Sequence, residues 1–98
     1  MDDITRYVYL RAADASFIID QLSNATAMAE LLPQRGPRQF PTDRVAMLGH
    51  SLGGCAAVIA AGQDPRIRGA INWDGTLYGS LPPSGLSQPV LLLSLIHI

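Results

Sequence analysis

The sequence predicts an α/β fold with a mostly parallel sheet, and three observations lead to this prediction. Three short segments, Val45–Leu48, Ile67–Trp73 and Val90–Leu95, are apolar without alternation, as is usual for strands buried on both faces. An alanine-rich segment of helical character, residues 55–61, separates the first two. This order is typical of parallel strands joined by a helix. Three such strands alone would leave long edges and an uncovered face, so we expect a central part of a larger domain.

The first predicted element is an amphipathic helix over residues 10–32. Pro33 ends this helix, and a polar loop containing Pro and Gly follows over residues 34–42. The apolar residues of the helix recur at intervals of three or four and form one stripe. The stripe consists of Ile18, Leu22, Ala25, Ala29 and Leu32.

A strand, a tight turn and a helix are predicted over residues 44–62. The turn, residues 49–54, reads Gly-His-Ser-Leu-Gly-Gly and matches the Gly-x-Ser-x-Gly pattern of serine hydrolases. A serine attacks only when a base takes its proton, and the attack creates an oxyanion that needs fixed N–H donors. A sharp turn lifts Ser51 clear of the backbone and aims the N–H of Leu52 at the developing charge. We therefore predict Ser51 as the nucleophile and Leu52 as an oxyanion-hole donor.

The glycines of the turn have a steric explanation. A sharp strand-to-helix turn crowds the backbone, so Gly49, Gly53 and Gly54 are predicted where a Cβ would clash. The positive end of the following helix would add a favourable field for an anion. The competing interpretation is a turn that only links a strand to a helix.

The next predicted strand, residues 67–74, ends in Asp74. A loop rich in Gly, Pro and Ser follows over residues 76–88, and the third strand is predicted over residues 90–95. Asp74 lies 23 residues after Ser51, at the carboxyl end of a parallel strand, where α/β active sites form. We predict it as the triad acid, which would hold a histidine in the correct tautomer. The competing interpretation is an Asp-Gly turn that starts a loop.

Composition limits the classes of function. The chain has 98 residues, a formal net charge of −1, 48% hydrophobic and 15% charged residues, which is a globular composition. Its seven basic residues are all scattered arginines, so no basic patch indicates nucleic acid. No spacing of His, Cys and Asp indicates a metal. We see no signal peptide, and the apolar run 90–98 is far below the roughly 20 residues of a transmembrane helix.

Four residues near the predicted site are interpreted as structural. The single cysteine, Cys55, is predicted to be a small buried packing residue rather than a reactive thiol. Asn72 and Trp73 are predicted to pack within the sheet, and Tyr78 to be a loop aromatic rather than part of an acyl or headgroup pocket.

Several segments resemble a known family. Residues 41–54, which end in the Gly-His-Ser-Leu-Gly-Gly turn, look like the core of the α/β-hydrolase superfamily. Residues 72–77 (Asn-Trp-Asp-Gly-Thr-Leu) and 88–93 (Gln-Pro-Val-Leu-Leu-Leu) narrow the resemblance to the platelet-activating factor acetylhydrolase family and its microbial relatives. Residues 17–22 (Phe-Ile-Ile-Asp-Gln-Leu) also look like that family, and the resemblance extends over about residues 10–94.

The resemblance implies a three-layer α/β-hydrolase sandwich, of which residues 1–98 form one partial domain around the nucleophile turn. It implies a serine ester hydrolase that acts through an acyl-serine on short acyl esters or phospholipids, without metal or organic cofactor. The implied partners are small-molecule ester or lipid substrates. In that family the triad acid ends the strand after the nucleophile helix, where this sequence has Asp74.

Neither histidine of the chain is predicted to be the triad base. His50 is part of the turn, and its side chain is expected to point to a different side from Ser51. His97 completes the order serine, acid, histidine, but it lies in an apolar tail, residues 95–98, where the family has a polar turn. We expect the histidine and the second oxyanion donor to lie outside this chain, which would then be inactive alone.

Two alternatives remain open. A general carboxylesterase, polyester hydrolase or lipase of the same fold could take its acid after the strand that begins at Val90, which would leave Asp74 structural. A hydrolase-like fragment that binds without catalysing is the non-enzymatic alternative.

Overall fold

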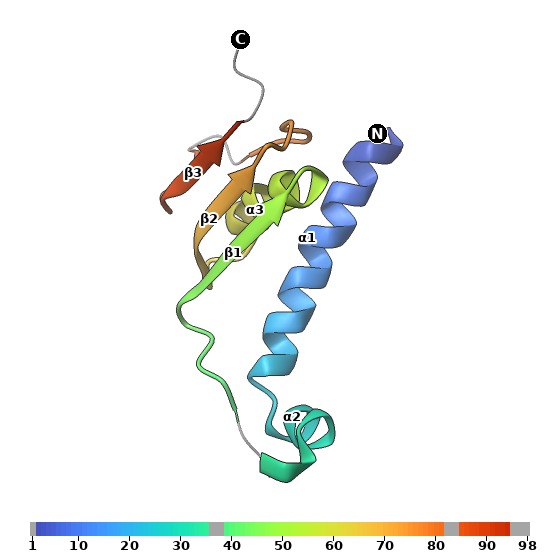
Figure 1. Ribbon diagram of the computed structural model, residues 1–98, viewed down its shortest axis with the longest axis vertical. Helices are drawn as coiled ribbons and strands as arrows, with labels where there is room; N and C mark the ends of the chain where they lie inside the picture. Colours follow the sequence, from blue (N-terminus) through green and yellow to red (C-terminus); the bar gives the residue numbers. More distant parts are fainter. Residues whose placement is uncertain (1, 36–38, 82–84, 95–98) are drawn as a thin grey trace.

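The computed structural model describes residues 2–35, 39–81 and 85–94 and has one parallel sheet with strand order β1-β2-β3 (Figure 1). Helix α3 packs against β1 and β2, and α1 packs against α3. The predicted α/β fold is therefore confirmed, with α3 connecting two parallel neighbours. The elements in chain order are α1 (Asp3–Leu22), α2 (Ala25–Leu31), the 3₁₀ turn η1 (Pro33–Arg35), β1 (Val45–His50), α3 (Leu52–Gln63), β2 (Ile67–Trp73) and β3 (Val90–Leu93).

The prediction of one helix over residues 10–32 is wrong, because two helices occupy this part of the chain. Helix α1 begins at Asp3, after the side chain of Asp2 accepts a hydrogen bond from the backbone N–H of Thr5 at 2.7 Å. It ends at Leu22, and Asn24 starts α2 by accepting a hydrogen bond from the N–H of Ala27 at 3.0 Å. Asparagine at this position competes with the helix ladder and favours a new helix start.

The buried face of α1 also differs from the predicted apolar stripe. Ile18, a member of that stripe, is 56% exposed, whereas Val8, Ala12 and Ile19 are buried. These three residues face α3, in which every residue from Gly54 to Ala61 is buried. Because five of these eight residues are alanine or glycine, the two helices can pack closely, and this contact determines which face of α1 turns inward.

The strands agree closely with their predicted positions, and their register brings their carboxyl ends to one edge. β3 ends at Leu93 rather than at residue 95, and residues 95–98 lie outside the described part of the chain. His50 of β1 is paired with Trp73 of β2, and Trp73 is paired with Leu93 of β3. Residues that directly follow β1 and β2 therefore emerge side by side.

One face of the sheet is apolar and exposed. Leu48, Trp73, Leu91 and Leu93 alternate with the residues that point toward α3, and each is at least 45% exposed. Among the described residues, helices cover only the other face, so two of the three expected layers are present.

A partly buried ion pair links α1 to the residues that precede β2. Asp64, which is 6% exposed, accepts hydrogen bonds from Arg66 Nη2 at 2.7 Å and from the hydroxyl of Ser16 at 2.8 Å. Arg66 Nη1 also donates to Asp20 of α1 at 2.7 Å. The hydrogen bonds from Arg66 hold the pKa of Asp64 far below its usual range, against the opposing effect of burial.

We predict that Asp64→Asn lowers the free energy of unfolding by about 1–2 kcal/mol at pH 7, because it removes a charged acceptor from Arg66. The pKa of Asp64 is lowered in the folded state, so the stabilisation is present above the unfolded pKa and fades as the pH falls toward the folded value. In urea unfolding, the free energies of unfolding of Asp64→Asn and of the unsubstituted protein should therefore differ by the same amount at pH 5 and at pH 7. The two free energies should approach each other below about pH 4.

The matched control is Asp43→Asn, since Asp43 forms an exposed pair with Arg44 at 3.8 Å. This variant should unfold as the unsubstituted protein does. A difference between the Asp64 variant and the unsubstituted protein that grew on acidification would contradict the assigned ion pair.

Candidate active site

Ser51 occupies a sharp turn between β1 and α3. Its backbone has φ 57° and ψ −124°, a region that non-glycine residues rarely adopt and that is common at functional sites. Ser51 is the N-cap residue of α3, yet its side chain makes no capping hydrogen bond, and the residue is exposed. Serine at an N-cap ordinarily uses its hydroxyl for capping. Here the hydroxyl is instead left available at the surface of the turn.

The steric explanation for the glycines holds at two of the three positions. A Cβ added to Gly49 would overlap the backbone carbonyl of Gly53, and one added to Gly54 would overlap the side-chain oxygen of Asn72. The prediction for Gly53 is wrong, because nothing lies within 4 Å of a Cβ at that residue. The strand and helix therefore approach each other through Gly49 and Gly54.

Leu52 is the first residue of α3, so its N–H has no hydrogen-bond partner inside the helix. The helix has 12 residues, and its N-terminus carries a partial positive charge beside Ser51. Both features suit a donor to an anion formed on a substrate at Ser51. The oxyanion-hole role of Leu52 stays a prediction.

Asp74 follows β2 directly and lies at the same edge of the sheet as Ser51. Its backbone N–H donates to the carbonyl of Leu93 at 2.6 Å, and its φ is 58°. The N–H of Ser51 donates to the carbonyl of Trp73 at 2.8 Å, which joins the two turns. The structure thus brings the predicted nucleophile and acid together, and their catalytic roles stay predictions.

A depression of about 240 Å³ lies between these two turns. Its lining combines polar and apolar side chains, as is common at ligand-binding sites. The residues around it are Ile4, Ser51, Leu52, Asp74, Thr76 and Tyr78. Tyr78, which was predicted to be a loop aromatic outside any pocket, therefore lines this depression.

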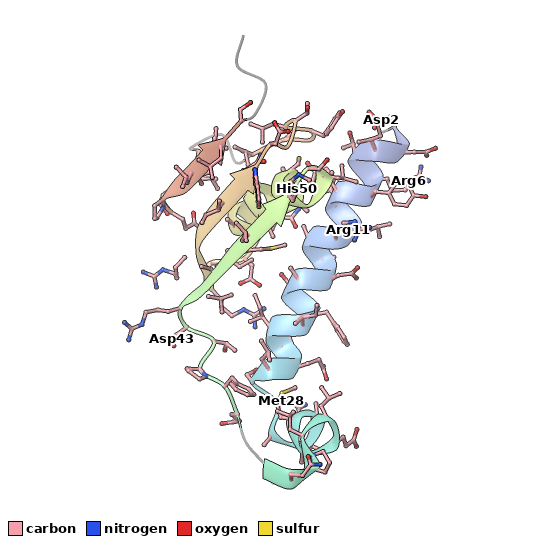
Figure 2. All side chains as sticks on the ribbon, viewed as in Figure 1. Asp2, Arg6, Arg11, Met28, Asp43 and His50 are labelled. Atoms are coloured by element: carbon pink, nitrogen blue, oxygen red, sulfur yellow. The ribbon has the colours of Figure 1, made fainter. Side chains whose placement is uncertain are left out.

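His50 lies at the end of β1 (Figure 2) and packs its ring against Trp73, edge to face, with ring centroids 5.3 Å apart and planes at 72°. Along β1, His50 alternates with residues that face α3, so it belongs to the exposed face of the sheet. His97 lies outside the described part of the chain.

Two neighbouring side chains have roles that the sequence only partly indicated. Cys55 is fully buried, as predicted, and its sulfur also accepts a hydrogen bond from the N–H of Tyr78 at 3.1 Å. Asn72 is buried within β2, as predicted, and its amide in addition bonds the backbone of Gly75. The available signal was an amide inside an apolar strand, since a buried amide requires partners.

Within the described ranges, no group of three or more His, Cys, Asp or Glu residues could hold a metal ion. The helices in the same ranges are too short or too polar to cross a membrane.

Comparison with known proteins links this arrangement to esterases of the α/β-hydrolase class. No protein-family model matches the chain. Over 46 residues the chain is 46% identical to a probable 1-alkyl-2-acetylglycerophosphocholine esterase of Arthroderma benhamiae, an alignment that covers 47% of this chain and 12% of that protein. The solved structure of a ferulic acid esterase from Streptomyces cinnamoneus matches with a TM-score of 0.78 and 33% identity, over 95% of this chain and 25% of that one.

The chain therefore resembles α/β-hydrolase esterases in both sequence and structure, as the motifs predicted. The name of the Arthroderma protein describes an esterase of the platelet-activating factor acetylhydrolase type, the family that the motifs resemble. The chain spans about a quarter of the solved esterase and about an eighth of the other.

We predict that Gly49→Ala destabilises the protein by more than about 2 kcal/mol, because the new Cβ must displace the Gly53 carbonyl. Gly53→Ala is the matched control, since its Cβ enters open space within a helix. That variant should be neutral or more stable by up to about 1 kcal/mol. Thermal unfolding of both variants tests the prediction, and equal effects of the two substitutions would contradict the assigned turn.

Proposed function

We propose that the full-length protein is a serine esterase that hydrolyses carboxylic esters through an acyl intermediate on Ser51. The observation that carries this proposal is the strained turn of Ser51, which leaves the hydroxyl outside the N-cap hydrogen bond and next to Asp74. The similarity to two proteins named as esterases supports it.

In the proposed mechanism, a base takes the proton of the Ser51 hydroxyl as its oxygen attacks the ester carbonyl. The N–H of Leu52 stabilises the resulting oxyanion. The protonated base then gives its proton to the departing alcohol, and water hydrolyses the acyl-serine by the same steps. We assign the base to a histidine outside the described residues, held in its tautomer by Asp74.

We further propose that the substrates carry a short acyl group, including phospholipids with a short chain. The depression beside Ser51 supports an ester with an acyl chain, because Ile4 and Leu52 give it an apolar lining that such a chain can contact. The name of the Arthroderma protein refers to an acetyl ester, which supports the same class. Residues 1–98 alone are proposed to be inactive, since His50 packs against Trp73 and Leu52 is one oxyanion donor of the two required.

A second candidate is a general carboxylesterase, polyester hydrolase or lipase whose acid follows β3. The ends of β2 and β3 lie side by side, since Trp73 pairs with Leu93, so a carboxylate after β3 could also reach this edge. In that case Asp74 would only shape the turn. The non-catalytic alternative is tested by the reactivity of Ser51.

We predict that a fluorophosphonate probe labels the full-length protein covalently at Ser51, because that hydroxyl is activated by a base. Peptide mass spectrometry should locate the probe on Ser51, and Ser51→Ala should abolish labelling. Ser87→Ala is the control, since Ser87 is exposed and lies at the other end of the sheet. Labelling that persists in folded Ser51→Ala would exclude Ser51 as the nucleophile.

We predict that Asp74→Asn lowers kcat for p-nitrophenyl acetate by about 10⁴-fold, because the histidine then loses its correct tautomer. Labelling at Ser51 should slow in parallel. Asp43→Asn is the control and should retain kcat, since Asp43 is exposed and precedes β1. A loss below about tenfold in Asp74→Asn would favour an acid after β3.

A further inference from the structure

Asn72 is a buried polar residue, the second-last residue of β2. It is 2% exposed, and its amide forms two hydrogen bonds with the backbone of Gly75. Asn72 Nδ2 donates to the carbonyl of Gly75 at 3.0 Å, and the N–H of Gly75 donates to Asn72 Oδ1 at 2.8 Å. Trp73 and Asp74 are the two residues enclosed by this bridge. The bridge therefore closes a small ring that contains the predicted triad acid.

The ring encloses Asp74 in a backbone conformation that is uncommon for a residue with a side chain. Its φ of 58° lies in the left-handed region, which is unfavourable for a residue with a Cβ. Such a conformation persists when surrounding contacts over-determine it. The bridge from Asn72 fixes Gly75, the residue that follows Asp74. The carbonyl of Leu93 fixes the backbone of Asp74 itself by accepting a hydrogen bond from its N–H.

The same amide also packs closely between the acid and nucleophile turns. A Cβ on Gly54, in the first turn of α3, would overlap Asn72 Oδ1. A Cβ on Gly75 would lie 2.6 Å from the same oxygen and would overlap the carbonyl of Ser51. Three backbone segments thus meet around the Asn72 amide without room for an additional carbon.

Two other side chains fix the rest of the loop in the same two-bond manner. The N–H of Tyr78 donates to Cys55 Sγ at 3.1 Å, and Cys55 Sγ donates to the carbonyl of Tyr78 at 3.5 Å. The hydroxyl of Tyr9 accepts from the N–H of Ser80 at 2.9 Å and donates to its carbonyl at 3.5 Å. The loop after β2 is therefore attached through side chains to β2, α3 and α1, and of these three side chains Asn72 is nearest to Asp74 in the sequence.

We propose that Asn72 is a positioning residue for catalysis. Through its bridge to Gly75 it holds the carboxylate of Asp74 at the same edge of the sheet as Ser51. This proposal rests on the proposed function, because it assumes that Asp74 is the triad acid. The bridge requires an amide, since one end must donate to a carbonyl while the other accepts from an N–H. The amide does both with two separate atoms, whereas an apolar side chain of similar size can do neither.

The test measures kcat and KM of Asn72→Ala in the full-length protein, per active site titrated with the fluorophosphonate probe. Titration removes any effect of a smaller folded fraction. We expect kcat to fall by about 10²-fold with KM within about threefold, as a misplacement near 1 Å can produce. The pH at which kcat/KM reaches half its plateau should also fall, because the histidine loses a stabilising carboxylate.

The deciding measurement is a double-mutant cycle with Asp74→Asn. If Asn72 acts through Asp74, then Asn72→Ala should change kcat by less than about twofold when Asp74→Asn is already present. Gln88→Ala is the matched control, because the amide of Gln88 donates to the carbonyls of Ala61 and Ile67 away from this edge. That control should retain kcat in both backgrounds. Sites are titrated with the probe where Asp74 is present, and in the Asp74→Asn background, where labelling is slow, kcat is given per folded protein measured by circular dichroism.

The outcomes separate this proposal from the proposed function. If Asn72→Ala lowered kcat equally with and without Asp74→Asn, the positioning role of Asn72 would be overturned. An unchanged pH profile of kcat/KM would overturn it as well. In both cases Asp74 would still be assigned as the triad acid. A small effect of Asp74→Asn alone would overturn the assignment of the acid, and the positioning role with it. Should Asn72→Ala fail to fold, Asn72→Leu enters the same cycle, since it keeps the branched shape of the amide, adds no charge and loses both hydrogen bonds to Gly75.

Discussion

The parallel pairing of β1 with β2 is the contact on which the candidate site depends. His50 of β1 is paired with Trp73 of β2, so the residues that follow them, Ser51 and Asp74, lie at the same level along the two strands. The hydrogen bond from the N–H of Ser51 to the carbonyl of Trp73 extends this pairing by one residue into the turn. A shift of the register by one residue would reverse the face of every side chain on one strand and separate the two turns. The helix packing and the loop contacts both act to keep this register.

Close approach between α3 and the sheet is the second requirement, and small residues provide it. Gly49 and Gly54 let the helix start directly above the end of β1, where larger residues would overlap the backbone. The alanines of α3 then allow α1 to pack closely on its other side. The ion pair between Asp64 and Arg66, which reaches α1 through Ser16 and Asp20, fixes the opposite end of the same layer.

The parts that the sequence predicted well are those decided by neighbouring residues. The strands and the turn at Ser51 depend on apolar runs and on glycine spacing, and both patterns are local. The inward face of α1 was predicted wrongly, because it depends on contact with α3, and an exposed Ile18 has the same hydropathy as a buried one. Asn24 is the N-cap residue of α2, and the prediction of a single helix, which rested on apolar periodicity alone, did not take this capping residue into account. The role of Asn72 depends on the left-handed backbone of Asp74, which the sequence does not display.

The central claim is that one histidine at this edge of the sheet takes the proton of Ser51 and is held in position by Asp74. A crystal structure of the full-length protein phosphonylated at Ser51 tests this claim most directly. The account predicts that the phosphonyl oxygen accepts a hydrogen bond from the N–H of Leu52. It also predicts that the imidazole beside Ser51 donates its other N–H to the carboxylate of Asp74 at about 2.6–3.2 Å. An imidazole paired instead with a carboxylate that follows β3 would contradict the account.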